Sequence, residues 1–201
     1  QPLGLHSHEI ADFDFSDPKF SQHLWLYEGM TEYFTIHMRI KQNMESLDEF
    51  LKVVEHKISK MNEFSNDISF TEFSKNVIDM PEDYMNVYFK GALINLCLDI
   101  RLRELSDGTY GVQNLIADLL DKYGKDKPFR DDDLFEEIYK QTGFSEIREF
   151  IEKHIQGTQP LPIKETFHKV GLMYDEETGK VTEMKTLNDE QRLLRKQWIN
   201  Q

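Results

Sequence analysis

The sequence predicts an all-α protein with about eight helices, and three observations lead to that prediction. Apolar residues recur at helical spacing through most of the chain after Phe20. Residues that start and stop helices bracket several of these stretches. The chain has 201 residues and no internal repeat, which favours one compact body of about one domain, or one domain plus an appendage, over a solenoid.

Residues 20–41 are expected to form the first helix, which differs from an ordinary amphipathic surface helix. Glu28 lies within a nearly all-round apolar segment from Leu24 to Met30, a pattern that normally indicates burial. A buried carboxylate must be neutralised, paired or bound to a metal. Gly29 costs about 1 kcal/mol relative to alanine inside a helix, so we expect another part of the chain to approach its backbone closely.

The next helices have clear start and stop signals. Ser46 and Glu49 have the spacing of a capping box, and Ser69 and Glu72 repeat it. Glycines follow most of the later helical stretches. We expect these helices at residues 47–61, 69–79, 112–123, 131–142 and 145–156.

Residues 83–105 are expected to form a second unusual helix, because apolar side chains fill most of its circumference. Tyr88, Asn95 and Asp99 lie at +7 and +11 spacing along one polar seam. Such a seam marks a candidate cleft wall. Cys97 is the single cysteine, and its aliphatic neighbours indicate an inert buried thiol.

The two ends of the chain differ from this helical middle. Residues 1–19 are expected to form a loop, and residues 157–162 a connector. Alternation around Glu177, Thr178 and Gly179 predicts a small hairpin within residues 172–185. A last helix is expected over residues 188–200, with Leu193, Leu194 and Trp198 on one side.

Charge and hydropathy exclude some classes of function. The chain has 24 Lys and Arg against 37 Asp and Glu, a net charge of −13. This excess of acid argues against binding to nucleic acid or to an anionic membrane surface. No apolar run approaches the ~20 residues that a membrane span needs. The sequence leaves the cellular compartment open.

The two unusual helices resemble sequence blocks of the glycyl aminopeptidase family, zinc metallopeptidases of the gluzincin group. The segment from Trp25 to Tyr33 is similar to the W-x-x-E-G-x-T-x-Y block of that family. Residues 88–93 and 99–104 resemble its Y-x-K-G-A-L and D-x-R-x-R-E blocks, and residues 150–172 resemble the end of its peptidase domain. The resemblance implies the helical C-terminal half of a thermolysin-like catalytic domain over residues 20–172. Residues 173–201 are then a hairpin and terminal helix appended to it.

The same resemblance implies roles for single residues. In such enzymes an H-E-x-x-H helix supplies two zinc-binding histidines and the general base, and a downstream glutamate is the third protein ligand of Zn²⁺. The resemblance implies that Glu28 is this ligand and that the Tyr88 phenol donates a hydrogen bond to the developing oxyanion. Glu32, Asn95 and Asp99 are further candidates, by helix geometry, for positions behind the ligand or along the cleft. The substrate implied is a peptide with a small N-terminal residue such as Gly or Ala.

The chain departs from the family pattern because H-E-x-x-H is absent from it. The nearest match is His8-Glu9-Ile10-Ala11-Asp12, in which Asp12 replaces the second histidine; His6, His8 and Asp12 are the alternative metal site. Residues 1–19 resemble the loop that follows the zinc-binding helix, so we expect that helix just before Gln1 in a parent protein. The chain alone is then expected to bind no zinc at the native site and to be inactive. Its partners would be the peptide substrate and the N-terminal part of the parent.

Other interpretations stay open. Without a metal, Glu28 is a salt-bridged or half-exposed glutamate and Tyr88 is a core tyrosine with a hydrogen-bonded tip. The chain is then a non-catalytic acidic scaffold or protein-interaction domain, or a degenerate relative whose parent lacks the histidines. The segment that precedes Gln1, and the effect of Glu28→Ala on zinc content, distinguish these interpretations.

Overall fold

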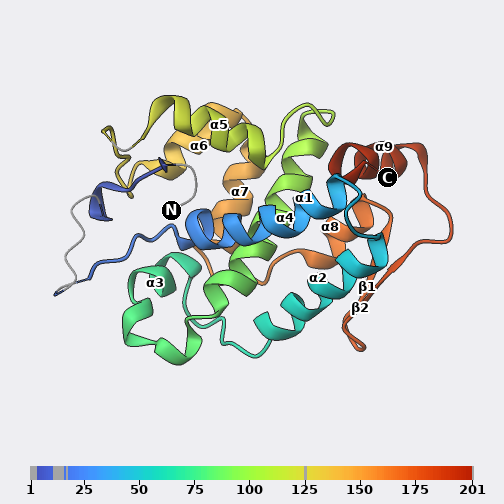
Figure 1. Ribbon diagram of the computed structural model, residues 1–201, viewed down its shortest axis with the longest axis horizontal. Coiled ribbons are helices and arrows are strands. Elements are labelled where there is room, and N and C mark those ends of the chain that lie inside the picture. Colours follow the sequence, from blue (N-terminus) through green and yellow to red (C-terminus); the bar gives the residue numbers. More distant parts are fainter. Residues whose placement is uncertain (1–3, 11–15, 17, 125, 201) are drawn as a thin grey trace.

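The computed structural model describes residues 4–10, 16, 18–124 and 126–200, and that part of the chain contains nine α-helices and one hairpin (Figure 1). This confirms the predicted all-α fold. The helices are α1 (Met30–Lys41), α2 (Leu47–Met61), α3 (Phe70–Lys75), α4 (Asn86–Leu105), α5 (Val112–Lys122), α6 (Leu134–Thr142), α7 (Ser145–His154), α8 (Ile163–Lys169) and α9 (Asp189–Ile199).

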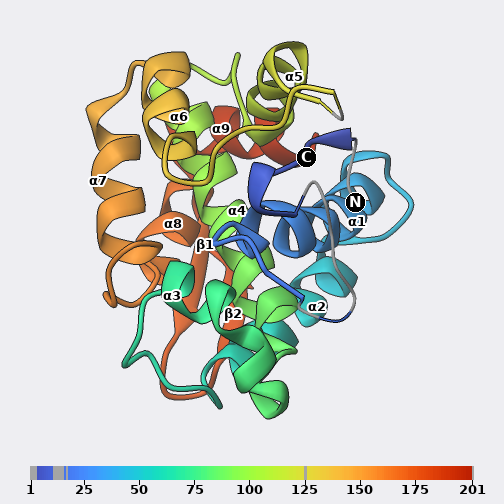
Figure 2. The same cartoon turned by 90° about the vertical axis from the view of Figure 1, so that its left-hand side faces the viewer.

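Helix α4 is the centre of the molecule. It is buried along most of its length and packs against α1, α2, α5, α7, α8 and α9. Figure 2 shows α4 in the middle, with α6 and α7 on one side of it and α1 and α2 on the other. Cys97 lies inside α4, where burial raises the pKa of its thiol to about 12, as expected for an inert cysteine.

The first predicted helix has two parts. A π-helical turn, η3 (Trp25–Gly29), leads directly into α1. π-helical turns are rare and occur frequently at functional sites. The sequence pattern predicted continuous helix here and did not distinguish the two helix types.

The helix-start signals are confirmed. The Ser46 side chain accepts a hydrogen bond from the Glu49 backbone N–H, and the Ser46 backbone N–H donates one to the Glu49 carboxylate. The Ser69 side chain caps α3 through the Glu72 backbone. Helix α3 is shorter than expected, because the Asn76 side chain bonds the Glu72 carbonyl and ends it. Two 3-10 turns follow, η4 (Val77–Asp79) and η5 (Pro81–Asp83).

The C-terminal segment packs into the core. Strands β1 (Leu172–Asp175) and β2 (Lys180–Glu183) form the predicted antiparallel hairpin, with Tyr174 opposite Val181. Helix α9 then places Trp198, which is fully buried, against α1 and α4. Leu194 is buried as well, but the neighbouring Leu193 is exposed, because adjacent positions on a helix lie about 100° apart. Helix α9 therefore packs against α1, α4 and α8.

The N-terminal segment is attached to the body through Asp131. Residues 7 and 129 form a parallel bridge, followed by a 3-10 turn, η2 (His8–Ile10). The hydroxyls of Ser7 and Ser21 and the backbone N–H of Gln22 donate hydrogen bonds to the buried Asp131 carboxylate. The described part of the predicted loop is thus tied to the segment before α6. The predicted domain boundaries stay predictions.

No helix in the described residues is both long enough and apolar enough to cross a bilayer.

Candidate active site

Two glycines make the closest contact between η3 and α4. A Cβ atom built on Gly29 would lie 2.5 Å from the carbonyl carbon of Gly91, and one built on Gly91 would lie 2.8 Å from the Cα of Gly29. No side chain fits at either position, so the two helical backbones touch there. The close approach predicted for Gly29 is confirmed.

The buried Asn95 side chain stabilises this contact between η3 and α4. Its side-chain amide donates to the backbone oxygen of Trp25 at 2.6 Å and to that of Gly91 at 2.9 Å. Asn95 is fully buried, and buried carbonyl groups need such partners. The hydrogen bonds therefore join the first residue of η3 to the turn of α4 that carries Gly91.

The crossing brings Glu28 and Tyr88 together. Both side chains are half-buried, and the Tyr88 phenol lies close enough to the Glu28 carboxylate for that negative charge to raise the pKa of the phenol. The Tyr84 ring lies edge-on to Tyr88, with 6.0 Å between ring centroids. Burial, a hydrogen bond with Tyr84 and the negative charge of Glu28 raise the pKa of Tyr88 well above its ordinary value. Tyr88 is therefore a neutral hydrogen-bond donor at pH 7.

The Glu28 carboxylate has no basic partner among the residues that the structure describes: no Lys, Arg or His there forms a salt bridge with it. Two interpretations of Glu28 need no metal, a salt-bridged glutamate and a half-exposed one. The structure fits the half-exposed glutamate. A carboxylate in this setting has oxygen lone pairs free to accept a cation or further hydrogen bonds.

Glu32 lies elsewhere and is paired. The Lys57 ammonium donates to it at 2.5 Å and is itself buried. This salt bridge joins α1 to α2. A lysine so placed needs its carboxylate partner, because an unpaired buried charge is costly. Glu32 therefore has a structural role in the described part of the chain.

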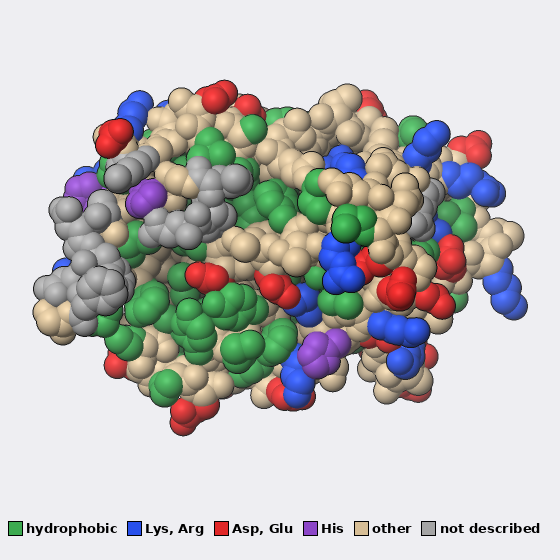
Figure 3. Space-filling view, in the orientation of Figure 1, with side chains coloured by type: hydrophobic (Ala, Val, Ile, Leu, Met, Phe, Trp, Pro, Cys, Tyr) green, Lys and Arg blue, Asp and Glu red, His purple; other side chains and the backbone are tan. Residues whose placement is uncertain are grey.

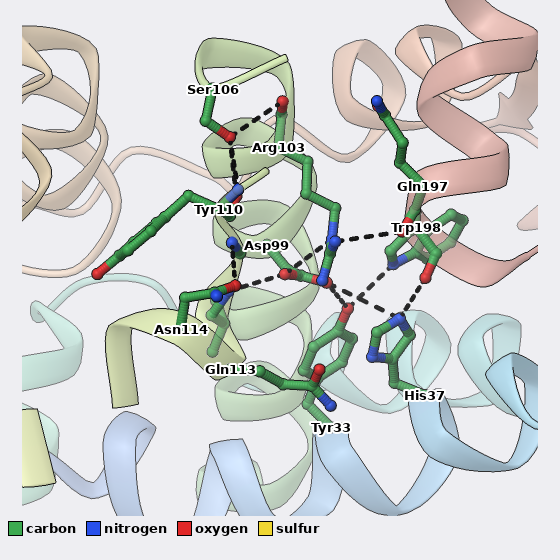
Figure 4. A network of polar contacts seen from close by, with 12 residues as sticks. Tyr33, His37, Asp99, Arg103, Ser106, Tyr110, Gln113, Asn114, Gln197 and Trp198 are labelled. Atoms are coloured by element: carbon green, nitrogen blue, oxygen red, sulfur yellow. Dashed lines mark hydrogen bonds and ion pairs between the residues drawn. The ribbon is translucent and has the colours of Figure 1, made fainter. Parts of the chain in front are cut away.

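Asp99 lies in a buried polar network between α1, α4, α5 and α9 (Figure 4). Tyr33 donates to one carboxylate oxygen of Asp99 at 2.7 Å, and the backbone N–H of Val112 donates to the other at 2.8 Å. Arg103 forms an ion pair with it at 3.2 Å. Asp99 is only 1% exposed and does not face a cleft. The part of the predicted polar seam that follows Tyr88 along α4 therefore points into the interior. Its side chains contact other helices there.

The structure therefore brings together two of the five candidate residues, Glu28 and Tyr88. Asn95 lies behind them and holds the backbone that carries them. Tyr84 was not among the sequence candidates, although its position four residues before Tyr88 is the spacing at which helical neighbours meet.

Hydrophobic side chains surround this region on the surface. In the space-filling view they gather over the segment before α4 and the start of that helix, with acidic side chains at the upper edge of the patch (Figure 3). Ile78, in η4, and Met85, directly before α4, are each 50% exposed. A patch of this kind beside polar groups is typical of a ligand-binding or protein-binding surface.

The alternative metal site at the N-terminus is not supported by the described residues. The His6 ring lies 2.8 Å from the Gly4 carbonyl oxygen, and His8 begins η2. Asp12 lies outside the described residues. Among the described residues, no group of three or more His, Cys, Asp or Glu side chains could hold a metal ion.

The same fold occurs in a solved structure. The chain is similar to the crystal structure of an aminopeptidase N family protein from Idiomarina loihiensis, with a TM-score of 0.75 and 24% sequence identity. The match covers 85% of this chain and 31% of that chain. The two share a helical fold, and this chain spans about a third of the solved structure.

Residues 4–94 match the model of the M61 glycyl aminopeptidase family. This match covers less than half of the chain and supports the glycyl aminopeptidase resemblance of its sequence blocks. Glu28, Gly29, Tyr88 and Gly91 all lie within the matched residues. None of the curated proteins compared with the chain matches it.

Proposed function

We propose that this chain is part of a zinc-dependent aminopeptidase that releases a small N-terminal residue, such as Gly or Ala, from peptides. In this proposal Glu28 is the third protein ligand of the zinc ion and Tyr88 is the phenol that stabilises the oxyanion. The observation that carries the proposal is the pairing of Glu28 with Tyr88 at the Gly29–Gly91 crossing.

The chemistry of Glu28 fits a zinc ligand. Carboxylate oxygens bind Zn²⁺ in proteins, usually beside histidines. Glu28 is half-buried, it is held on a π-helical turn, and no salt bridge in the described residues occupies it. Bound zinc polarises the scissile carbonyl group and lowers the pKa of a bound water. The other ligands and the general base would come from outside this chain, because a catalytic zinc needs three protein ligands. The chain alone is therefore expected to be inactive.

The setting of Tyr88 fits an oxyanion donor. Its raised pKa keeps the phenol protonated at neutral pH, and only the protonated phenol can donate a hydrogen bond. Its half-buried position also limits competition from water, which strengthens a hydrogen bond to developing charge. Met85 lies three positions before Tyr88, and its exposed apolar side chain offers a surface for a substrate.

The test uses the full-length protein that contains this chain, purified with its metal. Zinc per protein is measured by mass spectrometry of the metal, and turnover is measured with glycyl and alanyl p-nitroanilides. We expect Glu28→Gln to lose most of the bound zinc and the turnover with it, because the variant keeps the shape of the side chain but not its charge.

Glu32→Gln is the matched control, since it removes a carboxylate four residues away that is paired with Lys57. It should lower stability but keep zinc and turnover. Circular dichroism checks that both variants fold. If Glu28→Gln keeps its zinc and its turnover, Glu28 is not a ligand and the scaffold interpretation is favoured.

A further inference from the structure

Lys90 lies on the opposite side of α4 from the candidate active site. Lys90 is two positions after Tyr88, which corresponds to about 200° around a helix. Its side chain lines a pocket of about 750 Å³ between the end of α2, the start of α8 and β1. Much of the wall is apolar and includes Ile58, Met61, Leu161 and Ile163.

The Lys90 ammonium group is buried and has few polar partners in the described part of the chain. The residue is only 4% exposed. Its Nζ donates to the Asn66 side-chain oxygen at 2.6 Å and lies 6.0 Å from the centre of the Phe70 ring. An ammonium group has three donors, and in the described part of the chain no carboxylate forms a salt bridge with this one. Burial of an unpaired charge is costly, so the group would gain from an anion.

The charged groups around the pocket do not supply that anion. On α8 and the turn after β1, Glu176 pairs with Lys164 and Glu165 pairs with Lys169, while His168 lines the wall. Asp67 and Asp83 line a smaller hollow of about 200 Å³ that Lys90 also borders. The pKa of Lys90 is lowered to about 8 by burial, with no carboxylate raising it. Lys90 is thus mostly charged at pH 7 and lacks a counter-ion among the residues that the structure describes.

We propose that this pocket binds a small organic ligand that has one carboxylate on an apolar body, with the carboxylate on the Lys90 ammonium and the body against the Ile58, Met61 and Ile163 side chains. A pocket of 300–1,000 Å³ with mostly apolar walls and a few placed polar groups is typical of such ligands. The wall supplies the area for the apolar body, and Lys90 supplies the charge that selects an acid over a neutral compound. This inference does not rest on the proposed peptidase function.

The test is calorimetric titration of the full-length protein with 4-phenylbutyrate and octanoate, and with the neutral 4-phenylbutyramide. We expect both acids to bind at least ten-fold more tightly than the amide. Lys90→Met should remove this preference and Lys164→Met should keep it, because Lys164 is already paired at the pocket edge. Glu28→Gln should also keep it, which separates this pocket from any binding of carboxylates to zinc.

A second variant tests the same pocket in case Lys90→Met fails to fold. Asn62 is exposed and lines the same pocket, so Asn62→Trp should block the pocket, leave Lys90 unchanged and reduce binding of both acids at least ten-fold. The proposal is overturned if neither acid binds, if acid and amide bind equally, or if the preference for the acids survives in both pocket variants.

Discussion

At the scale of single residues, the two faces of α4 hold their polar groups in opposite electrostatic states. Tyr88 is kept neutral next to a carboxylate, whereas Lys90 is kept charged without one. Both groups are desolvated, and desolvation disfavours the charged form of each. The result is a phenol that stays protonated over a wider pH range than usual and an ammonium group that loses its proton earlier than usual.

For Tyr88 we predict a selective loss of rate. Tyr88→Phe in the full-length protein should lower kcat/KM by ~10²–10³, the usual effect of removing one oxyanion donor, with zinc content unchanged. Tyr110→Phe is the control, because Tyr110 also lies beside a carboxylate, that of Asp118 at 2.6 Å, but lies beyond the other end of α4. Equal rates in the wild-type protein and Tyr88→Phe would exclude the role proposed for Tyr88.

For Lys90 we predict a pH-dependent gain in stability on removal of the charge. The unfolded chain holds the Lys90 proton up to its ordinary pKa of 10.5, and the folded chain holds it only to about 8. The unfolded state therefore binds more protons between these values, and wild-type stability rises there relative to Lys90→Met.

In urea titrations Lys90→Met should be more stable than the wild type by about 2–3 kcal/mol at pH 7, and the difference should shrink as the pH rises from 8 to 10.5. Lys164→Met should show no such trend, since Lys164 is exposed. A difference that stays constant across this range contradicts the burial argument.

At the scale of elements, the contact between η3 and α4 determines where Glu28 lies. The two backbones touch at Gly29 and Gly91, and Asn95 bonds the carbonyl groups on both sides of the contact. Glu28 is the residue directly before Gly29, so any shift of the crossing moves the carboxylate relative to Tyr88.

We predict that Gly29→Ala loses about 1–3 kcal/mol of the free energy of unfolding, as overpacked sites do. The new Cβ would lie 2.5–2.7 Å from backbone atoms of Gly91, which cannot rotate away. Gly124→Ala is the control, because nothing lies within 4 Å of a Cβ built there. The measurement is a urea titration of both variants, and equal stability of the two would contradict the close contact.

The sequence predicted much of this arrangement and missed the rest for physical reasons. An unpaired glutamate in an apolar helix and a glycine beside it are local signals, and both indicated the crossing. The π-helical turn was missed because one extra residue per turn hardly changes the apolar pattern over so short a segment. Asp99 was predicted to lie behind the ligand or along the cleft because helix geometry gives only the side of a helix, whereas its partners Tyr33 and Val112 come from other elements of the chain.

At the scale of the whole molecule, residues from both ends of the chain complete the interior. Trp198 donates to the Tyr33 hydroxyl at 3.0 Å, and its backbone oxygen lies 2.8 Å from the His37 ring. Burial lowers the pKa of His37, so the ring is neutral at pH 7. Helix α9 thus contributes to stability as a core helix does.

We predict that Trp198→Ala loses about 3–5 kcal/mol of the free energy of unfolding, because it leaves a cavity and removes the hydrogen bond that the Tyr33 hydroxyl accepts. Leu193→Ala, on the exposed side of the same helix, should change stability by less than about 0.5 kcal/mol. Urea titration distinguishes the two. A small effect of Trp198→Ala would show that α9 is dispensable to the fold.

The network around Asp99 also sets an order of events during protein synthesis. A ribosome adds about 5–20 residues per second, and 165 residues separate Tyr33 from Trp198. For many seconds the nascent chain therefore holds Tyr33, His37 and Asp99 without the tryptophan that covers them. The final packing of α1 on α4 must wait for α9 to emerge, so chaperones have a long interval in which to bind the open core.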